Sequence, residues 1–303
     1  MRVFVTGASG WIGSAVVPEL RQAGHNVVGL ARSQASADAL AAAGAEVHRG
    51  SLEDLNSLQA GAAKADGVIH LAFIHDFSDY ERAVRADQRA IDALGAELEG
   101  SDQPFVIASG VAVVTSNGVA TEDDPPAPDF PRTAAALATL ALAERGVRPS
   151  VVRLPPTVHG RGDDGFVPTL INIARQRARS GYIGDGANRW PAVHRNDAAR
   201  LFRLALEEAP AGSVLHAVAD EGVLTRSIAE AIGRHLELPV VSVPPEQAAQ
   251  HFSWFGRFFA IDAPTSSLLT QERLGWKPTE PGLIEDLDEG HYFQDLTKRG
   301  LPV

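Results

Sequence analysis

Three glycines at a spacing of three open the chain and have the pattern of a phosphate-binding turn. They follow the apolar run 3–5 and precede an amphipathic stretch that reaches about residue 23. The first glycine would permit a sharp turn, the second would let the backbone approach a pyrophosphate, and the third would let the helix pack closely on a sheet. The spacing predicts a dinucleotide site at a helix N-terminus, the alternative being a structural turn that binds nothing. The expected contacts are Gly7, Ser9, Gly10, Trp11, Ile12 and Gly13.

The residues after the second apolar run, 26–31, bear on which dinucleotide is bound. An acidic side chain there would bind both ribose hydroxyls of NAD, but this chain has Arg32 and Ser33. A planar guanidinium and a hydroxyl suit a 2′-phosphate, so we predict NADP as the cofactor. The alternative is that Arg32 is a solvated surface side chain. We also expect contacts with the adenine or with the underside of the cofactor from Ser51, Leu52, Leu71 and Ala72.

Three polar residues follow or end apolar runs, where they could exchange a proton or bind a substrate oxygen. Ser109 ends the run 104–109, His75 follows the run 67–72, and His159 lies beyond a sixth run. Histidine titrates near neutral pH, which suits proton transfer, whereas a serine hydroxyl can orient a carbonyl. The alternatives are structural histidines held by hydrogen bonds and a serine bonded to backbone. These three residues are the candidate catalytic residues.

The elements that must position these residues alternate between strands and helices. Strands separated by helices indicate successive βαβ units. We therefore predict an α/β fold with a doubly wound parallel sheet of Rossmann type. Ligands of such sheets bind beyond the carboxyl ends of the strands, where the candidate residues would converge. The expected strands are 3–5, 26–31, 46–48, 67–72, 104–109 and 150–154, and the helices between them include 35–43, 79–99 and 133–144.

Beyond residue 155 loops lengthen, and glycine–aspartate turns and aromatic residues gather. We predict that 1–155 and about 188–218 form a cofactor lobe, and that 156–187 and 219–303 form a smaller C-terminal α/β substrate lobe. The segment 251–259 would either cap an apolar pocket or pack in the core of the second lobe. Helices are expected at about 167–180, from 196, and at 225–236, 245–259 and 283–293.

Composition excludes several classes of protein and site. The 303 residues include no cysteine, which excludes disulfides, thiolate metal sites and a cysteine nucleophile. A formal net charge of -11 argues against nucleic acid or an anionic membrane as the main partner. No apolar run approaches the ~20 residues of a membrane span, and no basic leader precedes the first strand. We expect a soluble cytoplasmic protein with a small-molecule substrate and no metal site.

Further motifs span nearly the whole chain. They are Thr6-Gly-Ala-Ser-Gly-Trp-Ile-Gly13, His70-Leu-Ala72, the loop 122–131, Val158-His-Gly160, Gly184-Asp-Gly186, Val193-His194 with Asp197, and Leu274-Gly-Trp276-Lys-Pro278. Together they resemble the extended and atypical short-chain dehydrogenases/reductases, the NAD-dependent epimerase/dehydratase-like group. The resemblance implies a Rossmann fold and a nicotinamide cofactor, and it implies the reaction less directly.

One departure from that group bears on catalysis. The group uses a Tyr-x-x-x-Lys pair, in which the lysine lowers the tyrosine pKa so that the phenol exchanges a proton with the substrate. The tyrosine falls here on Arg132 and the lysine on Ala136. The active-site asparagine falls on Asp87, and the serine or threonine falls on Ser109 or its neighbour Gly110. The resemblance therefore carries over cofactor binding but not the proton donor.

From these observations we predict an NADP-dependent oxidoreductase of the atypical short-chain type that acts on a small carbonyl or alcohol. The alternatives are a non-catalytic NADP-binding redox sensor and a sugar-nucleotide epimerase/dehydratase relative. Arg132 would hold an anionic substrate or polarise a carbonyl, unless it forms a rim ion pair with Asp123 or Asp124. The stretch 133–144 is apolar all round, which favours either a homodimer through this helix or a further layer of the same chain.

Overall fold

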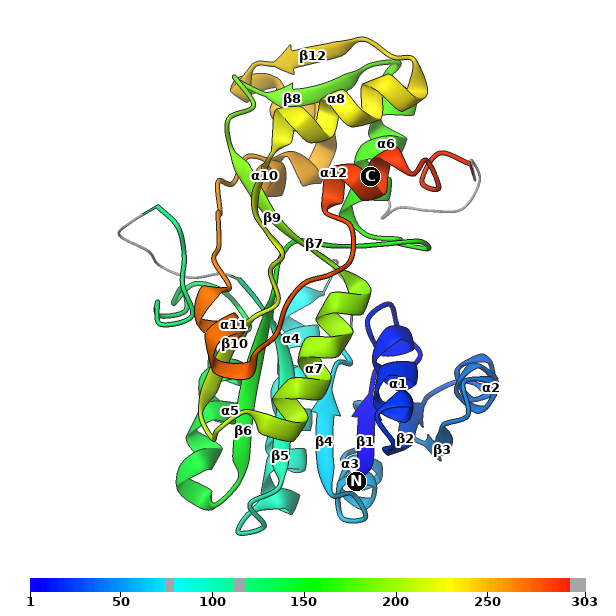
Figure 1. Ribbon diagram of the computed structural model, residues 1–303, viewed down its shortest axis with the longest axis vertical. Helices are drawn as coiled ribbons and strands as arrows, with labels where there is room; N and C mark the ends of the chain where they lie inside the picture. The colour runs from blue at the N-terminus through cyan, green and yellow to red at the C-terminus, as the bar shows by residue number, and fades with distance from the viewer. Residues whose placement is uncertain (75–78, 112–117, 295–303) are drawn as a thin grey trace.

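A parallel seven-stranded sheet forms the centre of the larger, first lobe (Figure 1). The computed structural model describes residues 1–74, 79–111 and 118–294. The strand order is β10-β6-β5-β4-β1-β2-β3, so the chain winds outward from β1 in both directions. This confirms the predicted doubly wound α/β fold of Rossmann type. The strands are β1 (Arg2–Thr6), β2 (Asn26–Ala31), β3 (Glu46–Arg49), β4 (Gly67–His70), β5 (Pro104–Gly110), β6 (Arg148–Leu154) and β10 (Ser213–His216).

Side chains of β1 alternate between the two faces of the sheet, and helices cover each face. Val3 and Val5 join a core cluster with α1, α2 and α7, whereas Phe4 joins a second cluster with α3, α4 and α5. Because both faces are buried, the central strands are apolar throughout rather than alternating. The helices are α1 (Gly13–Gln22), α2 (Gln34–Ala42), α3 (Leu55–Ala62), α4 (Tyr80–Leu98), α5 (Thr133–Ala141) and α7 (Arg195–Glu208).

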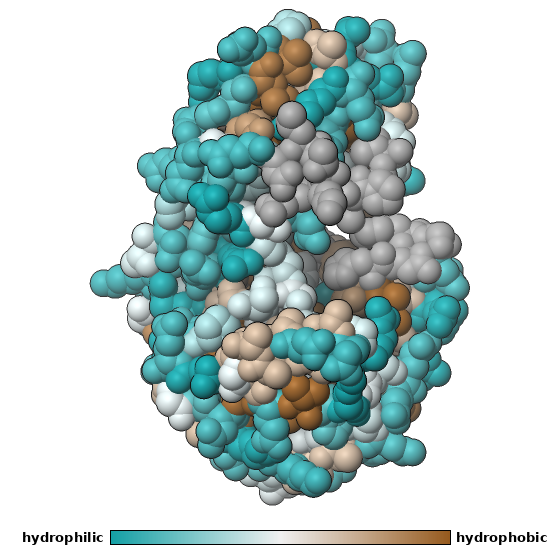
Figure 2. Space-filling view, turned by 90° about the vertical axis from the view of Figure 1, so that its right-hand side faces the viewer, coloured by the Kyte–Doolittle hydropathy of each residue, from teal (hydrophilic) through white to brown (hydrophobic). Residues whose placement is uncertain are grey.

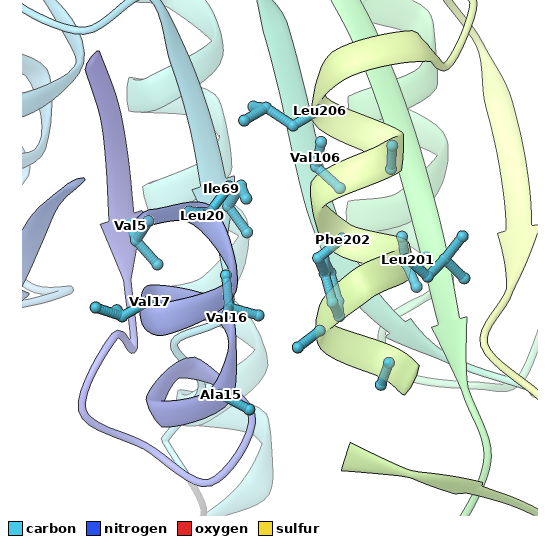
Figure 3. Packing of buried hydrophobic residues seen from close by; sticks show 14 of the residues in the cluster. Val5, Ala15, Val16, Val17, Leu20, Ile69, Val106, Leu201, Phe202 and Leu206 are labelled. Carbon is cyan, nitrogen blue, oxygen red and sulfur yellow. The ribbon is translucent and has the colours of Figure 1, made fainter. Parts of the chain in front are cut away.

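The helix that follows the glycine-rich turn packs beside a helix almost 200 residues later in the chain. Figure 3 shows Val16 and Leu20 of α1 and Phe202 and Leu206 of α7 directed toward the strands between them. These four side chains are fully buried. Burial of a large aliphatic or aromatic side chain contributes about 1.5 to 3 kcal/mol, so this layer holds the glycine-rich turn firmly against the sheet.

A smaller second lobe contains two short sheets and its own core (Figure 1). One sheet has the order β11-β9-β7 and the other pairs β12 with β8. Among the described residues, no helix has the length and apolarity needed to cross a bilayer. The elements are β7 (Thr157–His159), β8 (Ser180–Ile183), β9 (Arg189–His194), β11 (Asp220–Leu224), β12 (Val240–Val243), α6 (Phe166–Arg177), α8 (Thr225–Leu236), α9 (Ala248–Phe252), α10 (Gly256–Phe259), α11 (Leu268–Leu274) and α12 (Leu283–Asp288).

Two expected helices of the second lobe are shorter than predicted. The single helix expected over 245–259 is interrupted, because Ser253 adopts a φ of 57° that no α-helix allows. Short 3₁₀ turns at Pro245–Gln247 and Ser253–Phe255 flank α9 and lead into α10. The last helix ends at Asp288 rather than near 293, and Gly290 follows it with a φ of 80°. Glycine is the residue that most readily ends a helix in this way.

Candidate active site

The glycine-rich turn presents unpaired backbone donors where α1 begins. Gly10 donates its N–H to the carbonyl of Gly7 at 2.9 Å, which closes the turn. Among the described residues, no acceptor is recorded for the N–H groups of Trp11, Ile12 and Gly13, and no side chain caps the helix. These donors lie at the positive end of the helix dipole, so the turn fits an anionic phosphate group.

The surroundings of the three glycines differ in the way that their predicted roles require. A side chain at Gly13 would collide with the carbonyl oxygen of Gly7, and Gly7 itself has a φ of 66° that favours glycine. A Cβ at Gly10 would meet only the Gly7 carbonyl oxygen, at 3.1 Å. Gly10 and Ser9 are exposed. The outer side of Gly10 is therefore open to a ligand, whereas Gly7 and Gly13 are required by the protein itself.

Trp11 connects the turn to the second lobe. Its indole N–H donates to the carbonyl of Val158 in β7 at 2.8 Å, and the guanidinium of Arg195 lies 4.4 Å from its ring centroid. Its side chain therefore has a structural partner in addition to the backbone role predicted from the sequence. Figure 2 shows the molecular surface hollowed between the two lobes.

The end of β3, beside the end of β2, carries a second basic residue that the sequence prediction missed. Arg32 and Ser33 are exposed, and the Ser33 hydroxyl accepts the N–H of Ser36 at 3.1 Å, which caps α2. Arg49 ends the neighbouring strand, paired in register with Ala31, and donates to the Ser33 carbonyl at 2.7 Å. The pattern that could have revealed Arg49 is its place at the end of an adjacent parallel strand.

The other predicted cofactor contacts lie around the same edge of the sheet. Leu71 donates its N–H to the carbonyl of Thr6 at 3.2 Å, and Ala72 packs directly beside Gly7. Ser51 and Leu52 follow β3 in a half-buried turn, in which the Ser51 carbonyl accepts the N–H of Asp54. Thus the structure brings Leu71 and Ala72 next to the glycine-rich turn, at the point where β4 ends.

A buried chain of hydrogen bonds runs from this point to Arg132. The Thr6 hydroxyl accepts the Ala72 N–H at 3.3 Å and contacts His70 Nδ1 at 2.8 Å. His70 Nε2 lies 3.2 Å from one oxygen of Asp87, and Arg132 Nε donates to the other at 3.2 Å. We assign the Thr6 hydrogen to His70 Nδ1 and the imidazole hydrogen to Nε2, because this arrangement gives each bond one donor. We call these four side chains, Thr6, His70, Asp87 and Arg132, the first network.

Asp87 is fully buried yet ionised. Burial alone would raise its pKa, but the hydrogen bond from His70 and the charge of Arg132 together hold the pKa below its usual value. Arg132 also donates from Nη2 to the carbonyl of Ala108 at 2.8 Å, and its guanidinium lies 4.6 Å from the ring centroid of Phe73. Its side chain is 15% exposed. A fixed cation thus lies at the carboxyl edge of the sheet, close to the end of β5.

The alternative of a rim ion pair between Arg132 and the acidic loop is wrong. Asp123 pairs with Arg273 at 2.9 Å, and the Asp124 carboxylate accepts the N–H and hydroxyl of Thr121. Arg132 pairs with Asp87 because α4 and α5 pack on the same face of the sheet. The acidic loop contacts α11 instead, where a Glu122 oxygen accepts a hydrogen bond from the N–H of Thr270.

Tyr80 is a further residue of this region that the sequence prediction did not single out. It opens α4, and its ring centroid lies 5.8 Å from that of Phe73, which also contacts Arg132. Burial raises the pKa of the Tyr80 phenol, the charge of Arg132 lowers it, and Asp87 raises it again. Tyr80 is one of only three tyrosines. The signal that could have revealed it is a phenol at the start of the helix after a sheet strand.

The three candidate catalytic residues lie in different surroundings. Ser109 is nearly buried near the end of β5 and adjoins Ala108, whose carbonyl binds Arg132. His159 is fully buried in the second lobe, where its Nδ1 lies 2.8 Å from Asp286 and its Nε2 has no recorded partner among the described residues. His75 lies outside the described residues. Only Ser109 among these is placed beside the first network.

A second histidine–aspartate group surrounds His159. The other oxygen of Asp286 contacts His291 Nε2 at 2.8 Å, and the ring of His194 lies 5.5 Å from that of His159. We call these four side chains, His159, His194, Asp286 and His291, the second network. Ligand atoms of Asp286, Glu289 and His291 lie within 4.8 Å of one another. A metal ion there would have to displace the hydrogen bonds that Asp286 already accepts.

Near this network, Asp163 is buried and its pKa is raised to about 7. Burial is the main cause, and hydrogen bonds from the Gly165 N–H and the Tyr292 hydroxyl oppose it. The aromatic segment 251–259 mostly packs inward, since Phe252, Phe255 and Phe259 are buried in the second-lobe core. Phe258 is 45% exposed. The core-packing alternative therefore describes most of this segment.

Comparison with known proteins places the fold and the turn in a family. Residues 3–217 match the model of the NAD dependent epimerase/dehydratase family. The chain belongs to this family. The match covers both β1 with its turn and the strands through β10, which confirms the resemblance drawn from the motifs.

Individual relatives of this family member range from near to distant. An uncharacterized protein of Schizosaccharomyces pombe is 53% identical over 97% of this chain and 100% of its own length. A 4-hydroxy-2-methyl-3-oxo-4-farnesyl-3,4-dihydroquinoline-1-oxide ketoreductase of Stigmatella aurantiaca is 29% identical over 71% of this chain and 67% of its own. The structure of UDP-glucose 4-epimerase from Thermotoga maritima with UDP-glucose superposes with a TM-score of 0.76. The two sequences are 20% identical, and the superposition covers 97% of this chain and 99% of the epimerase chain.

Proposed function

We propose that this chain is an NADP-dependent oxidoreductase that acts on a small carbonyl or alcohol. The observation that carries the proposal is a glycine-rich turn whose N–H groups have no recorded acceptor among the described residues, together with a fixed cation at the carboxyl edge of the same sheet. When bound, the nicotinamide would supply or accept the hydride. The ketoreductase among the relatives supports this class of reaction.

Preference for NADP over NAD rests on Arg32, with Arg49 beside it. Charge-assisted hydrogen bonds contribute about 1.5 to 3 kcal/mol each, which corresponds to roughly a 10- to 100-fold preference for the 2′-phosphate. Titration calorimetry should show that Arg32→Ala loses this preference while NAD affinity hardly changes. Arg21→Ala is the matched control, because Arg21 lies at the opposite end of α1. Equal affinities of the wild-type protein for both dinucleotides would refute the preference.

The roles of the three candidate catalytic residues stay predictions. According to the sequence prediction, Ser109 would orient a substrate oxygen beside Arg132, and His159 or His75 would supply the proton. His159 is fully buried, and its Nε2 has no recorded partner in the part of the chain that the structure describes, so the proton would need a path from Nε2 to the substrate. The position of Arg132 and Ala136 in place of the family's tyrosine and lysine favours the rival proposal, an NADP-binding redox sensor without turnover.

A consumption assay with NADPH across a panel of small ketones and aldehydes tests the function. We expect turnover that Gly10→Ala abolishes, because the added methyl group would face the pyrophosphate while meeting the protein only at the Gly7 carbonyl. Ser14→Ala, an exposed change one turn away, should leave turnover intact. Tight NADP binding without turnover of any carbonyl would favour the sensor. Turnover of a UDP-sugar instead would favour the epimerase/dehydratase alternative.

The remaining proposals concern the whole molecule. We propose that 1–155 and about 188–218 form the cofactor lobe, and that 156–187 and 219–303 form the substrate lobe. We place the protein in the cytoplasm on the basis of its acidic, cysteine-free composition. A homodimer would form through α5, whose outward face includes Leu137 at 50% exposure. Sedimentation should then show that Leu137→Glu converts a dimer to a monomer.

A further inference from the structure

An aromatic side chain, a phenol and a guanidinium meet at the switch point of the sheet. β1 and β4 are neighbours in the sheet although β2 and β3 separate them in the chain, and ligands of doubly wound folds bind at such a point. Phe73 follows β4, Tyr80 opens α4, and Arg132 directly precedes α5. The centroid of the Phe73 ring lies 5.8 Å from that of Tyr80 and 4.6 Å from the guanidinium carbon of Arg132. A group from α4 and a group from the residue before α5 thus contact one aromatic ring.

We propose that Tyr80 donates the proton in the carbonyl reduction and that Arg132 stabilises the phenolate left behind. This inference rests on the proposed function. Tyr80 would give its hydroxyl hydrogen to the carbonyl oxygen while the carbonyl carbon receives the hydride of NADPH. The carbonyl is thereby reduced to an alcohol, NADPH is oxidised to NADP⁺, and the phenolate regains a proton from solvent.

The hydrogen bonds of Arg132 leave one side of its guanidinium available. Its Nε and Nη2 are committed to Asp87 and Ala108, whereas no hydrogen bond of Nη1 is recorded among the described residues. Asp87 and the Ala108 carbonyl hold the guanidinium in place, so little reorganisation is needed when a negative charge forms nearby. Arg132 would therefore do for Tyr80 what a lysine does for tyrosine in the family's usual pair.

The two charged groups that act on Tyr80 have opposite effects. Arg132 lowers the pKa of the phenol and Asp87 raises it, while burial has the largest effect and raises it. The other candidate donors fit less well. His159 is fully buried and bound to Asp286 in the second lobe. Ser109 has a hydroxyl that hardly ionises near neutral pH, so it suits orientation better than proton donation.

The activity test compares two tyrosines that each have an arginine beside them. Tyr80→Phe should lower kcat by about 10²- to 10⁴-fold with little change in the Kd of NADP. Tyr182→Phe is the matched control. The guanidinium carbon of Arg226 lies 5.5 Å from the Tyr182 ring centroid, but Tyr182 lies on β8 of the second lobe. Tyr182→Phe should retain wild-type turnover. Full activity of Tyr80→Phe would overturn the inference and leave the proposed function standing.

A second readout needs neither substrate nor cofactor. With only three tyrosines, the absorbance titration of the wild-type protein minus that of Tyr80→Phe isolates the Tyr80 phenol. Arg132→Gln should raise the pKa of this phenol, Arg132→Lys should keep it near the wild-type value, and Asp87→Asn should lower it. A general loss of packing would instead shift the phenol pKa of Arg132→Gln and of Asp87→Asn in the same direction.

The two readouts separate failure of the inference from failure of the proposed function. If no carbonyl is reduced by the wild-type protein, the function fails and the titration alone decides whether Arg132 acts on Tyr80. A phenol pKa that is the same in Arg132→Gln and the wild type would overturn the inference. Loss of kcat in His159→Gln together with full activity of Tyr80→Phe would also overturn it and would assign proton donation to His159.

Discussion

The first and second networks are built from the same pair of side chains, a buried histidine bonded to a buried aspartate. In both, hydrogen bonds and charge outweigh burial and hold the aspartate pKa below its usual value. They differ in what the second carboxylate oxygen contacts. Asp87 contacts Arg132, whose charge is permanent, whereas Asp286 contacts another histidine, His291.

This difference indicates different duties for the two networks. The first network ends in a permanent cation at the carboxyl edge of the sheet, where chemistry would take place. The second joins α12 to the end of β7 and lies within the second lobe. The first is suited to hold a catalytic cation, and the second to hold elements of the second lobe together.

The largest effect is expected from removing the carboxylate of the first network. Asp87→Ala would leave Arg132 without its buried counter-ion, and breaking a buried ion pair in this way costs about 3 to 5 kcal/mol. Urea unfolding at pH 7 measures the free energy of unfolding. Asp286→Asn is the comparison variant, because its amide oxygen can still accept from one imidazole. If both variants lose equal stability, the permanent charge of Arg132 is not what distinguishes the networks.

A change in stability of intermediate size is expected at Asp163, beside the second network, and its pH dependence is opposite to that of Asp87. Asp163 has a pKa raised to about 7, so the folded protein binds a proton that the unfolded chain has already lost above about pH 4. The stability contributed at this site therefore falls as pH rises from about 4 to 7 and stays low above 7.

Asp163→Asn cannot ionise and keeps an oxygen for the Gly165 N–H. Its stability relative to the wild-type protein should improve by about 2 to 3 kcal/mol between pH 5 and pH 8, since one pKa unit corresponds to about 1.4 kcal/mol. Urea unfolding at both pH values checks this. For Asp87 the sign is reversed, because a lowered pKa contributes stability above about pH 4 that is lost as pH falls. A relative stability of Asp163→Asn that does not change with pH would contradict the raised pKa.

The smallest effect is expected from the coupling between two histidines of the second network. Burial lowers the pKa of His194, and the neighbouring charge of His159 lowers it further. His159→Gln should raise the pKa of His194, observed as a shift of its imidazole resonances in an NMR titration. The loss of one hydrogen bond to Asp286 should cost only about 1 kcal/mol. An unchanged pKa of His194 in this variant would mean that the two rings do not interact electrostatically.

Local patterns were sufficient to predict most of the first lobe. The strand ends of β2 and the start of α5 were predicted to the residue, because long buried runs bounded by glycine or proline carry a strong signal. β11, β12 and α11 were missed, since each is short and partly exposed. Their stability comes from pairing with distant segments, such as β12 with β8, and no local pattern encodes that partner.

The sequence by itself determined the parallel sheet, the glycine-rich turn and the basic end of β2, because each depends on neighbours within a few residues. Only the tertiary structure decided what Arg132 binds and which phenol lies near it. Arg132 is 45 residues from Asp87 in the chain, and the two meet because α5 and α4 pack on the same face of the sheet. Likewise Tyr80 and the guanidinium come from different parts of the chain and both contact Phe73. Contacts between side chains on different helices depend on how the helices pack, which no single stretch of sequence specifies.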